Sequence, residues 1–361
     1  MAHRAASDFL NDYLHIGPPE VLEKYDIYST KLASETAKLL NCSADEITYI
    51  KNTTEGIIIA SESLPLEFGD EVLLMGQEYP ANILPWLKKK KDGLNVKILS
   101  EEKNDLAFSK LIESITPKTK VVSISWGQYY DGYLPDLQLL SKVCKENNVF
   151  LVIDGVHGIG TRKIDLQKIH VDILSCGGQK TIGALPGIGF MYINKSTLSK
   201  LNDFKVGIRS VKNFDFEGYE IKDVAERFQD GTQNLIGVVS LYAAIRHINA
   251  LGIENIEKKN LKLLSIYKKI LYKNKIEFID HKNQANIISL KVSNPVGLVH
   301  FLRQHGVYIK TVKDVARISF THSSNVKDFN VVVKHIRDWS NSAHNMVAKI
   351  RSQKSIINSS L

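Results

Sequence analysis

The stretch that decides the fold is Val149-Phe150-Leu151-Val152-Ile153-Asp154-Gly155-Val156-His157. Its first five residues are apolar without a polar break, a pattern typical of a strand buried on both faces of a sheet. The strand ends at the carboxylate of Asp154. Open α/β sheets bind their ligands just outside the carboxyl ends of their strands. We therefore expect a ligand to bind beside Asp154.

A second short strand, 172–175, leads into the glycine-rich turn Gly177-Gly178-Gln179-Lys180. Because parallel strands bring their carboxyl ends to one edge of a sheet, Asp154 and Lys180 are expected to meet there. The pair suits a cofactor that carries both a basic ring nitrogen and an aldehyde. Pyridoxal phosphate (PLP) is such a cofactor, since its enzymes use a lysine Schiff base and an acidic partner at the pyridine nitrogen.

The composition is that of a globular protein with one large domain and one smaller domain. The chain has 361 residues, of which 43% are hydrophobic and 24% are charged, which excludes a disordered or collagen-like chain. No run reaches the ~18 consecutive apolar residues of a membrane helix, and the first residues lack the apolar stretch of a signal peptide. The three cysteines are far apart and make neither a disulfide framework nor a zinc ligand set. We expect a cytoplasmic protein without membrane contacts or a bound metal.

The net charge of +8 would suit a nucleic acid or another anionic partner. The excess lies in lysine runs on helical patterns, at 88–91 and between 258 and 275. Few aromatic residues are interleaved with these lysines, and no nucleic-acid-binding motif accompanies them. Solvated helix faces are the simpler explanation, and we expect no nucleic-acid partner.

Short apolar strands alternate with helical patterns along most of the chain. This alternation favours an α/β fold with a mainly parallel sheet that is covered on both sides. The long segment 201–228 interrupts it, as functional or subunit-facing loops do. Strands are expected at 47–50, 71–75, 96–99, 121–125, 149–153, 172–175 and 188–193, and helices at 31–41, 81–91, 105–115, 136–147 and 235–251.

Four parts of the chain are expected from this pattern. Residues 1–30 contain Gly17-Pro18-Pro19 and aromatic clusters, and we interpret them as an N-terminal arm. A large PLP-binding domain follows at 31–251 and a small α+β domain at 252–345. The polar residues 346–361 are expected to form a frayed tail.

Each candidate site residue has a structural explanation as well as a functional one. Asp154 alone would be a strand-end residue that caps a turn, and Lys180 alone would be one solvated lysine among many. The neighbouring glycines favour function, because they let a flat ligand approach the backbone closely. Thr53 and Thr54 follow a strand and either cap the next helix or bind a phosphate at its N-terminus. Tyr79 either packs in a turn or lies over a pyridine ring.

Six short motifs carry a resemblance to a known family. The chain resembles the class V aminotransferase family of PLP-dependent enzymes, which includes cysteine desulfurases and isopenicillin N epimerase-like proteins, from about Leu10 to Trp339. The resemblance implies the fold type I architecture and a homodimer with active sites at the subunit boundary. The motifs are Thr53-Thr54-Glu55-Gly56, Glu78-Tyr79-Pro80-Ala81-Asn82, Asp154-Gly155-Val156-His157, Gly178-Gln179-Lys180, the stretch 227–234 and Arg317-Ile318-Ser319.

The resemblance implies roles for the residues around the cofactor ring. Lys180 would form the Schiff base, and Asp154 would pair with the ring nitrogen. His157, otherwise a turn histidine, would contact the side of the ring that carries the phenolic oxygen. Tyr79 would stack on the ring. Gln128 lies within one residue of the position where the family usually has a ring-contacting asparagine.

The resemblance also implies how the phosphate and the substrate would be held. Thr53 and Thr54 would bind the phosphate, together with Gln179, which stands where many members have histidine. Gly231 and Thr232 match the segment that reaches the phosphate across the dimer. The substrate's α-carboxylate would be bound by Arg317, because arginine is a planar bidentate donor; without the family context it would be an ion-pairing residue on a strand.

The chain departs from the family at two places. Cysteine desulfurases carry a nucleophilic cysteine on a loop shortly before the carboxylate-binding arginine, whereas the segment 306–314 here is short and has no cysteine. Cys176 is expected to point into the sheet, and Cys42 and Cys144 lie in helical patterns. Persulfide transfer by the usual route is therefore not expected. Gly177 stands where many members place a serine or threonine that contacts the phosphate.

We expect an enzyme that binds a small amino acid or keto acid, with Lys180 as the general base at the α-carbon. Transamination is favoured because it needs no residue beyond those found. The alternative is a PLP-dependent lyase or epimerase, including a C–S lyase without the usual catalytic cysteine. A non-catalytic regulatory protein of the same fold is the remaining alternative, and no appended DNA-binding domain supports it.

Overall fold

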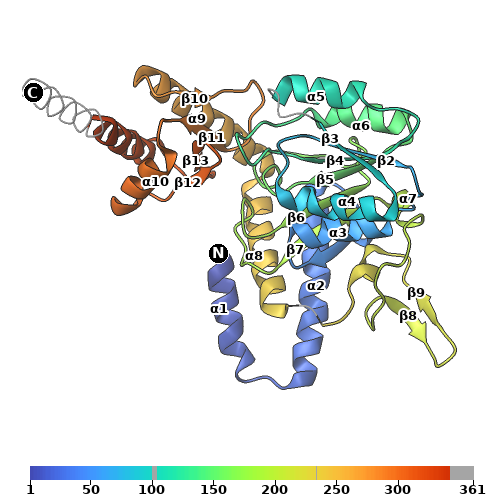
Figure 1. The fold of residues 1–361 in the computed structure, drawn as a ribbon. Helices are drawn as coiled ribbons and strands as arrows, with labels where there is room; N and C mark the ends of the chain where they lie inside the picture. Colours follow the sequence, from blue (N-terminus) through green and yellow to red (C-terminus); the bar gives the residue numbers. More distant parts are fainter. Residues whose placement is uncertain (100–103, 233, 342–361) are drawn as a thin grey trace, which may run out of the picture. The chain divides into compact units, whose positions relative to one another are not determined.

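The computed structural model describes residues 1–99, 104–232 and 234–341, which form two compact units (Figure 1). The large unit comprises Met1–Tyr129 and Tyr133–Glu257, and the small unit comprises Tyr130–Gly132 and the chain from Lys258 onward. The division falls within helix α9 (Ile253–Lys273), whereas the sequence analysis placed it at 251, the end of α8 (Leu235–Leu251). The predicted tail at 346–361 lies outside the described residues.

The large unit is built on a seven-stranded sheet with the order β1-β7-β6-β5-β4-β2-β3 (Figure 1). Strands β2 to β6 pair in parallel, and β7 runs antiparallel to both of its neighbours. The mainly parallel sheet predicted from the sequence is thereby confirmed. The strands are β1 (Ile47–Ile50), β2 (Glu71–Leu74), β3 (Asn95–Ile98), β4 (Thr119–Ser125), β5 (Phe150–Asp154), β6 (Ile173–Gly177) and β7 (Gly189–Ile193).

Helices cover both faces of this sheet. The α-helices and 3-10 helices between the strands are η1 (Ala44–Glu46), α3 (Thr53–Ser63), η2 (Pro80–Asn82), α4 (Leu84–Lys89), η3 (Lys90–Asp92), α5 (Asn104–Glu113), α6 (Leu137–Glu146) and α7 (Lys195–Leu198). The helix predicted at 81–91 is thus two 3-10 turns flanking a short α-helix.

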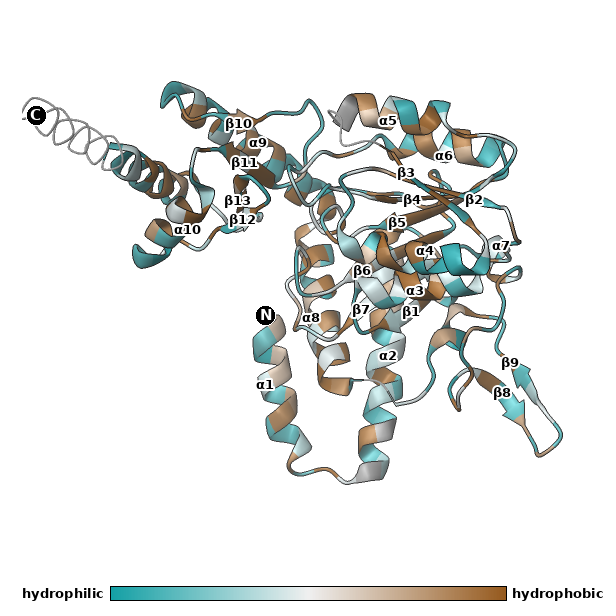
Figure 2. Cartoon of the chain, in the orientation of Figure 1, coloured by the Kyte–Doolittle hydropathy of each residue, from teal (hydrophilic) through white to brown (hydrophobic). Residues whose placement is uncertain are grey.

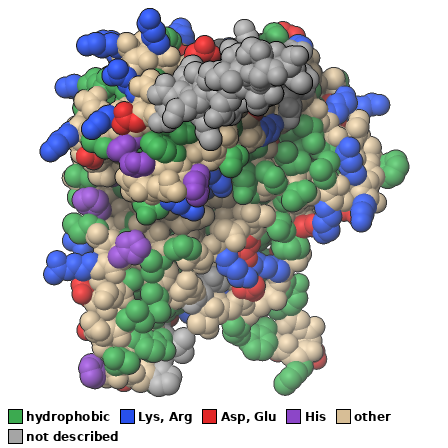
Figure 3. Space-filling view, turned by 60° about the vertical axis from the view of Figure 1, so that its left-hand side comes forward, with side chains coloured by type: hydrophobic (Ala, Val, Ile, Leu, Met, Phe, Trp, Pro, Cys, Tyr) green, Lys and Arg blue, Asp and Glu red, His purple; other side chains and the backbone are tan. Residues whose placement is uncertain are grey.

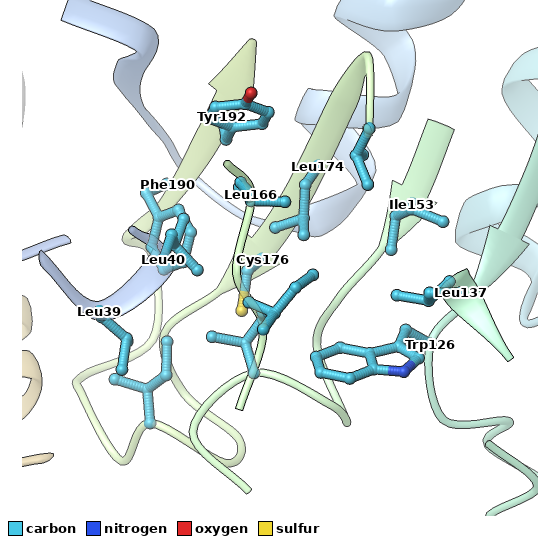
Figure 4. Close-up of a cluster of buried hydrophobic side chains, with 14 of the residues drawn as sticks. Leu39, Leu40, Trp126, Leu137, Ile153, Leu166, Leu174, Cys176, Phe190 and Tyr192 are labelled. Atoms are coloured by element: carbon cyan, nitrogen blue, oxygen red, sulfur yellow. The ribbon is translucent and has the colours of Figure 1, made fainter. Parts of the chain in front are cut away.

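Alternate side chains of the central strands enter two different hydrophobic clusters. On β5, Leu151 and Ile153 belong to one cluster and Val152 to the other, because successive strand residues point to opposite faces. The first cluster joins the sheet to α5, α6, α8 and α2 (Pro18–Leu40), and Figure 4 shows part of it; the second joins the sheet to α3 and α4. The apolar colour of the strands in Figure 2 reflects this burial on both faces.

Helices make up most of the first forty residues, where the sequence predicted an N-terminal arm at 1–30 and a helix only from residue 31. α1 (Ala2–Tyr13) buries Ala2, Ala6 and Phe9, and it contacts α8. α2 begins at Pro18 and not near residue 31, with Gly17 as its N-cap. Proline is tolerated in the first turn of a helix, since the N–H that it lacks would have no helical partner there. Gly17-Pro18-Pro19 therefore starts a helix instead of marking a loop.

The segment 201–228 also contains regular structure that the sequence analysis did not predict. β8 (Val211–Phe214) and β9 (Tyr219–Ile221) form an antiparallel hairpin, followed by the 3-10 helix η4 (Ala225–Phe228). Ile208, Phe214, Phe216 and Tyr219 are exposed on or beside this hairpin. A two-stranded hairpin gives only a short apolar pattern, which is difficult to distinguish from a loop.

The small unit is an antiparallel sheet with helices packed against it, as expected for an α+β unit. The strand order is β10-β11-β13-β12, and the core includes Tyr267 of α9, which stacks on Phe329 with ring centroids 3.9 Å apart. Its elements are β10 (Phe278–Ile279), β11 (Ile287–Lys291), α10 (Pro295–Gln304), β12 (Lys310–Val312), β13 (Val315–Ser319), most of α9 and a helix at 326–341.

Lysine and arginine side chains are spread over the face of the molecule seen in Figure 3, among hydrophobic and other side chains. Within the described ranges, no single helix is long and apolar enough to cross a membrane; α8 and α9 pass that test only as a broken pair. In the same part of the chain, no group of three or more His, Cys, Asp or Glu side chains is arranged to hold a metal ion.

Candidate active site

The carboxyl ends of β5 and β6 bring the two decisive residues of the sequence to one edge of the large sheet. Asp154 is the last residue of β5, in register with Ser125 of β4 and Ser175 of β6. The turn after β6 carries Lys180, and the Lys180 charge acts on the carboxylate of Asp154. The two side chains were predicted to meet because β5 and β6 pair in parallel and end at the same edge of the sheet.

Asp154 is a buried carboxylate with only 3% of its surface exposed. Its Oδ1 accepts a hydrogen bond of 3.0 Å from the backbone N–H of Val156. Burial raises the pKa of Asp154 to about 6; the Val156 N–H and Lys180 oppose this increase, whereas Glu78 adds to it. A ligand with a basic nitrogen would stabilise the ionised carboxylate by supplying the positive charge that the buried site lacks.

Lys180 lies between a histidine and an aromatic ring. Its Nζ is 3.4 Å from Nε2 of His157 and 5.4 Å from the centroid of the Tyr79 ring. Tyr79 is 43% exposed, and its ring meets that of Tyr129 edge to face with centroids 5.2 Å apart. The two tyrosines form an aromatic wall beside the lysine, and a flat ligand would gain stacking energy there.

The N-terminus of α3 forms the second part of the site. Thr53 Oγ1 accepts a hydrogen bond of 2.9 Å from the backbone N–H of Gly177, and Ser175 Oγ donates to the backbone oxygen of Thr53 at 2.9 Å. Asn52 caps the helix through the N–H of Glu55. The first N–H groups of α3, including that of Thr54, therefore lie at the turn that precedes Lys180. A helix N-terminus in this position is suited to bind a phosphate.

Two glycines allow this close approach. A Cβ at Gly56 would lie 2.3 Å from Ser175 Oγ, so α3 packs against β6 without room for a larger residue. A Cβ at Gly177 would lie 2.7 Å from Gln179 Oε1 and 3.1 Å from Thr53 Oγ1. The space that a serine or threonine would take at position 177 is thus bordered by Thr53 and Gln179, which stand close to the place expected for the phosphate.

The predicted contact of Gln128 with the cofactor ring stays a prediction. It is fully buried, and its Nε2 donates a hydrogen bond of 2.6 Å to Glu78 Oε1. The next residue, Tyr129, is the one that meets the exposed Tyr79 ring. The position of the family's asparagine was expected only to within one residue, and Tyr129 contacts the Tyr79 ring, which lies beside Lys180.

Three of the predicted residues, Gly231, Thr232 and Arg317, belong to later segments of the chain. Gly231 and Thr232 follow η4, and their neighbour Asp230 is ion-paired with Lys205, which also pairs with Glu55 of α3. Their role across a dimer stays a prediction. Arg317 belongs to β13 of the small unit, in register with Ser289, and its binding of a substrate carboxylate likewise stays a prediction.

Glu78 is a site residue that could not be recognised from the motif in which it lies. Glu78 is buried, with 3% of its surface exposed, and accepts hydrogen bonds from Asn82, Ser125 and Gln128. The only feature of the sequence that could have indicated its burial is its place soon after the end of a buried strand. Glutamates in such places more often face solvent.

The side chains present at this edge fit PLP. A buried carboxylate, a lysine reaching the same edge, an aromatic wall and a helix N-terminus match the ring nitrogen, the aldehyde, the ring face and the phosphate of PLP. The fold and the site together define a PLP-dependent enzyme of fold type I.

The family model for class V aminotransferases matches residues 23–332, and the chain belongs to this family. It is similar to a probable cysteine desulfurase from Methanothermobacter thermautotrophicus, with 27% identity over 264 residues, 72% of this chain and 66% of that protein. A cysteine desulfurase from Wigglesworthia glossinidia brevipalpis is 29% identical over 337 residues, 84% of this chain and 80% of its own.

The fold is shared with the cystine C–S lyase C-DES. A structure of a C-DES variant with glycine covalently linked to its PLP cofactor matches with a TM-score of 0.86 at 22% identity, covering 93% of this chain and 92% of that chain. Another C-DES structure contains its reaction product, cysteine persulfide. The predicted family, fold class and cofactor are therefore confirmed. The relatives' names favour the predicted lyase alternative over transamination.

Proposed function

We propose that this protein is a PLP-dependent lyase that cleaves the carbon–sulfur bond of a small sulfur-containing amino acid and releases the sulfur product directly. The relatives named cysteine desulfurases support a sulfur-containing substrate. Direct release distinguishes this proposal from desulfuration through a cysteine of the enzyme itself.

The state of the three cysteines carries the proposal. Cys144 and Cys176 are fully buried, and Cys42 is half-buried after the end of α2. Burial raises the pKa of Cys42 and of Cys144 to about 12, and it raises the pKa of Cys176 as well. The thiolate is the nucleophilic form of cysteine, so these thiols are inert near neutral pH. A sulfur atom that leaves the substrate therefore has no cysteine of this chain to attack it.

The residues at the sheet edge would divide the work of the reaction. Bound PLP supplies an electron sink for the substrate's α-carbon. Lys180 Nζ would remove the α-proton, and His157, 3.4 Å from that nitrogen, is placed to exchange a proton with it. Asp154 would hold a positive charge at the ring nitrogen, and the N-terminus of α3 would hold the phosphate. The sulfur then leaves the β-carbon with the electron pair of the broken bond.

We also propose that the protein acts as a homodimer. The exposed apolar side chains on or beside the β8–β9 hairpin, Ile208, Phe214, Phe216 and Tyr219, support this proposal. Large exposed apolar patches mark interaction surfaces on soluble proteins. Sedimentation at two protein concentrations would test it, and a monomer at micromolar concentration would contradict it.

Product analysis tests the proposed reaction. The purified protein with PLP is incubated with cysteine or cystine, and pyruvate, alanine, sulfide and persulfide are measured. We expect pyruvate and ammonia, with sulfide from cysteine or persulfide from cystine. Alanine as the main product would indicate desulfuration instead. Products that form only when a keto acid is added would restore transamination as the function.

A further inference from the structure

The carboxylate of Glu78 is saturated with hydrogen bonds although it is buried. Its Oε1 accepts from the Ser125 N–H at 2.8 Å and from Gln128 Nε2 at 2.6 Å; its Oε2 accepts from Asn82 Nδ2 at 3.0 Å and from the Ser125 hydroxyl. A carboxylate has about four acceptor sites, and all four donors here are neutral. Burial raises the pKa of Glu78, and these four hydrogen bonds offset part of the increase.

These bonds join segments that carry site residues. Glu78 directly precedes Tyr79, and Gln128 directly precedes Tyr129, so the Glu78–Gln128 bond links the two tyrosines that meet edge to face. Ser125, the last residue of β4, is in register with Asp154. Glu78 therefore fastens the aromatic wall to the strand edge at which Asp154 lies.

The side-chain amide of Gln128 is held mainly by this carboxylate. Its Nε2 donates to Glu78, with a longer contact of 3.9 Å to Met75 Sδ, and its buried Oε1 has no hydrogen-bond partner among the described residues. An unpaired buried acceptor costs free energy, and a strong bond on the other side of the amide is needed to keep the side chain in place.

Glu78 also acts on Asp154 through its charge. It is one of the groups that raise the pKa of Asp154, and Lys180 opposes it. The charge of Asp154 also acts on the buried thiol of Cys176 and helps to raise the pKa of that thiol. The two buried carboxylates make this edge of the sheet favourable for a further positive charge.

We propose that Glu78 is a positioning residue for PLP, which joins Tyr79 and Tyr129 to the end of β4 and places a second buried carboxylate beside Asp154. The inference rests on the proposed function only in that PLP must bind at this edge. Its two parts, orientation and charge, are separable. Gln128→Met would disturb the orientation and keep the charge, whereas Glu78→Gln would remove the charge and disturb the donors.

A matched control lies at the other end of β2, the strand that precedes Glu78 in the chain. Glu71, the first residue of β2, is 2% exposed, accepts a hydrogen bond of 2.7 Å from Thr119 Oγ1 and is ion-paired with Lys97. It is as deeply buried as Glu78, but it lies at the amino end of the strands, away from Lys180. Glu71→Gln therefore measures the general effect of neutralising a buried glutamate.

The experiment measures PLP affinity by absorbance titration of the cofactor-free proteins, together with the pH midpoint of the absorbance change of bound PLP. We expect Kd for PLP to rise at least about tenfold in Glu78→Gln and in Gln128→Met, and to stay within about twofold in Glu71→Gln. In Glu78→Gln, the pH midpoint should fall by at least about half a unit, because a protonated group loses a nearby negative charge. Gln128→Met should leave it unchanged.

Wild-type affinity and midpoint in Glu78→Gln would overturn the inference. Equal losses of affinity in Glu78→Gln and Glu71→Gln, with no shift of the midpoint, would do the same, because they would indicate a purely structural role. If Glu78→Gln does not fold, Gln128→Met provides the test. Wild-type affinity for PLP in Gln128→Met would overturn the role of Glu78 in orienting the tyrosines. Failure of the wild-type protein to bind PLP would instead refute the proposed function.

Discussion

Replacing Asp154 by asparagine should stabilise the cofactor-free protein in a pH-dependent way. Burial raises the pKa of Asp154 from 3.8 to about 6, so the folded state binds this proton more tightly than the unfolded state. Below pH 3.8 the side chain is neutral in both states and costs nothing. As the pH rises through 6, the folded protein must ionise a buried carboxylate, and stability is lost. Asparagine does not ionise, so it adds no such pH-dependent loss of stability.

The size of the effect follows from the same pKa values. An increase of about two pH units, at about 1.4 kcal/mol per unit, amounts to about 3 kcal/mol. The stability of Asp154→Asn relative to wild type should therefore grow by about 2–3 kcal/mol between pH 4 and pH 7.5. Any loss from an unpaired amide N–H is the same at both pH values and cancels in this comparison. The groups that face Asp154, namely Glu78, Lys180 and Cys176, are the same in both proteins.

Urea unfolding of both cofactor-free proteins at a series of pH values measures this quantity. The same variant should bind PLP much more weakly, because the ring nitrogen loses its acidic partner. A site that is unfavourable when empty and favourable when filled is expected of a binding residue. A relative stability that stays constant with pH, or that grows toward acid, would show that Asp154 is not a destabilised carboxylate and would refute the reasoning.

Three further predictions concern the neighbouring residues. Gly56→Ala should push α3 away from Ser175, lower the free energy of unfolding by about 1–3 kcal/mol and weaken PLP binding. Urea unfolding and absorbance titration measure these two effects. Unchanged PLP affinity would contradict the role of α3. Tyr79→Ala should raise Kd for PLP about threefold to tenfold through lost stacking, with unchanged unfolding, because the side chain is 43% exposed. Cys42→Ala should keep full lyase activity in a sulfide assay, and a loss of more than tenfold would instead indicate a cysteine nucleophile.

Burial and periodicity made the large sheet predictable. The five apolar residues 149–153 lead into and form β5, which sends alternate side chains into two clusters, as a strand of a sheet covered on both faces does. Asp154 and Lys180 were predictable because the first ends such a strand and the second lies in the turn after another. The start of α2 was missed because proline favours both loops and first helical turns, and the choice between them depends on tertiary contacts.

The polar network beneath the site could not be predicted in the same way. Nothing in the sequence distinguishes Glu78 from a solvated glutamate, because its burial depends on Ser125 and Gln128, which are distant along the chain. The same holds for Gln128 and Tyr129: adjacent residues in a loop have no fixed period, so only the structure shows which of them is buried. The β8–β9 hairpin was missed because its strands are short.

Borohydride reduction of the PLP-treated protein, followed by peptide mass spectrometry, tests the central claim most directly. Reduction makes the bond between the cofactor and its lysine permanent, so the modified residue can be identified. We predict a single modified lysine, Lys180, and no modification in the Lys180→Ala variant. Modification of a different lysine, or no modification at saturating PLP, would contradict the assignment of this sheet edge as the active site.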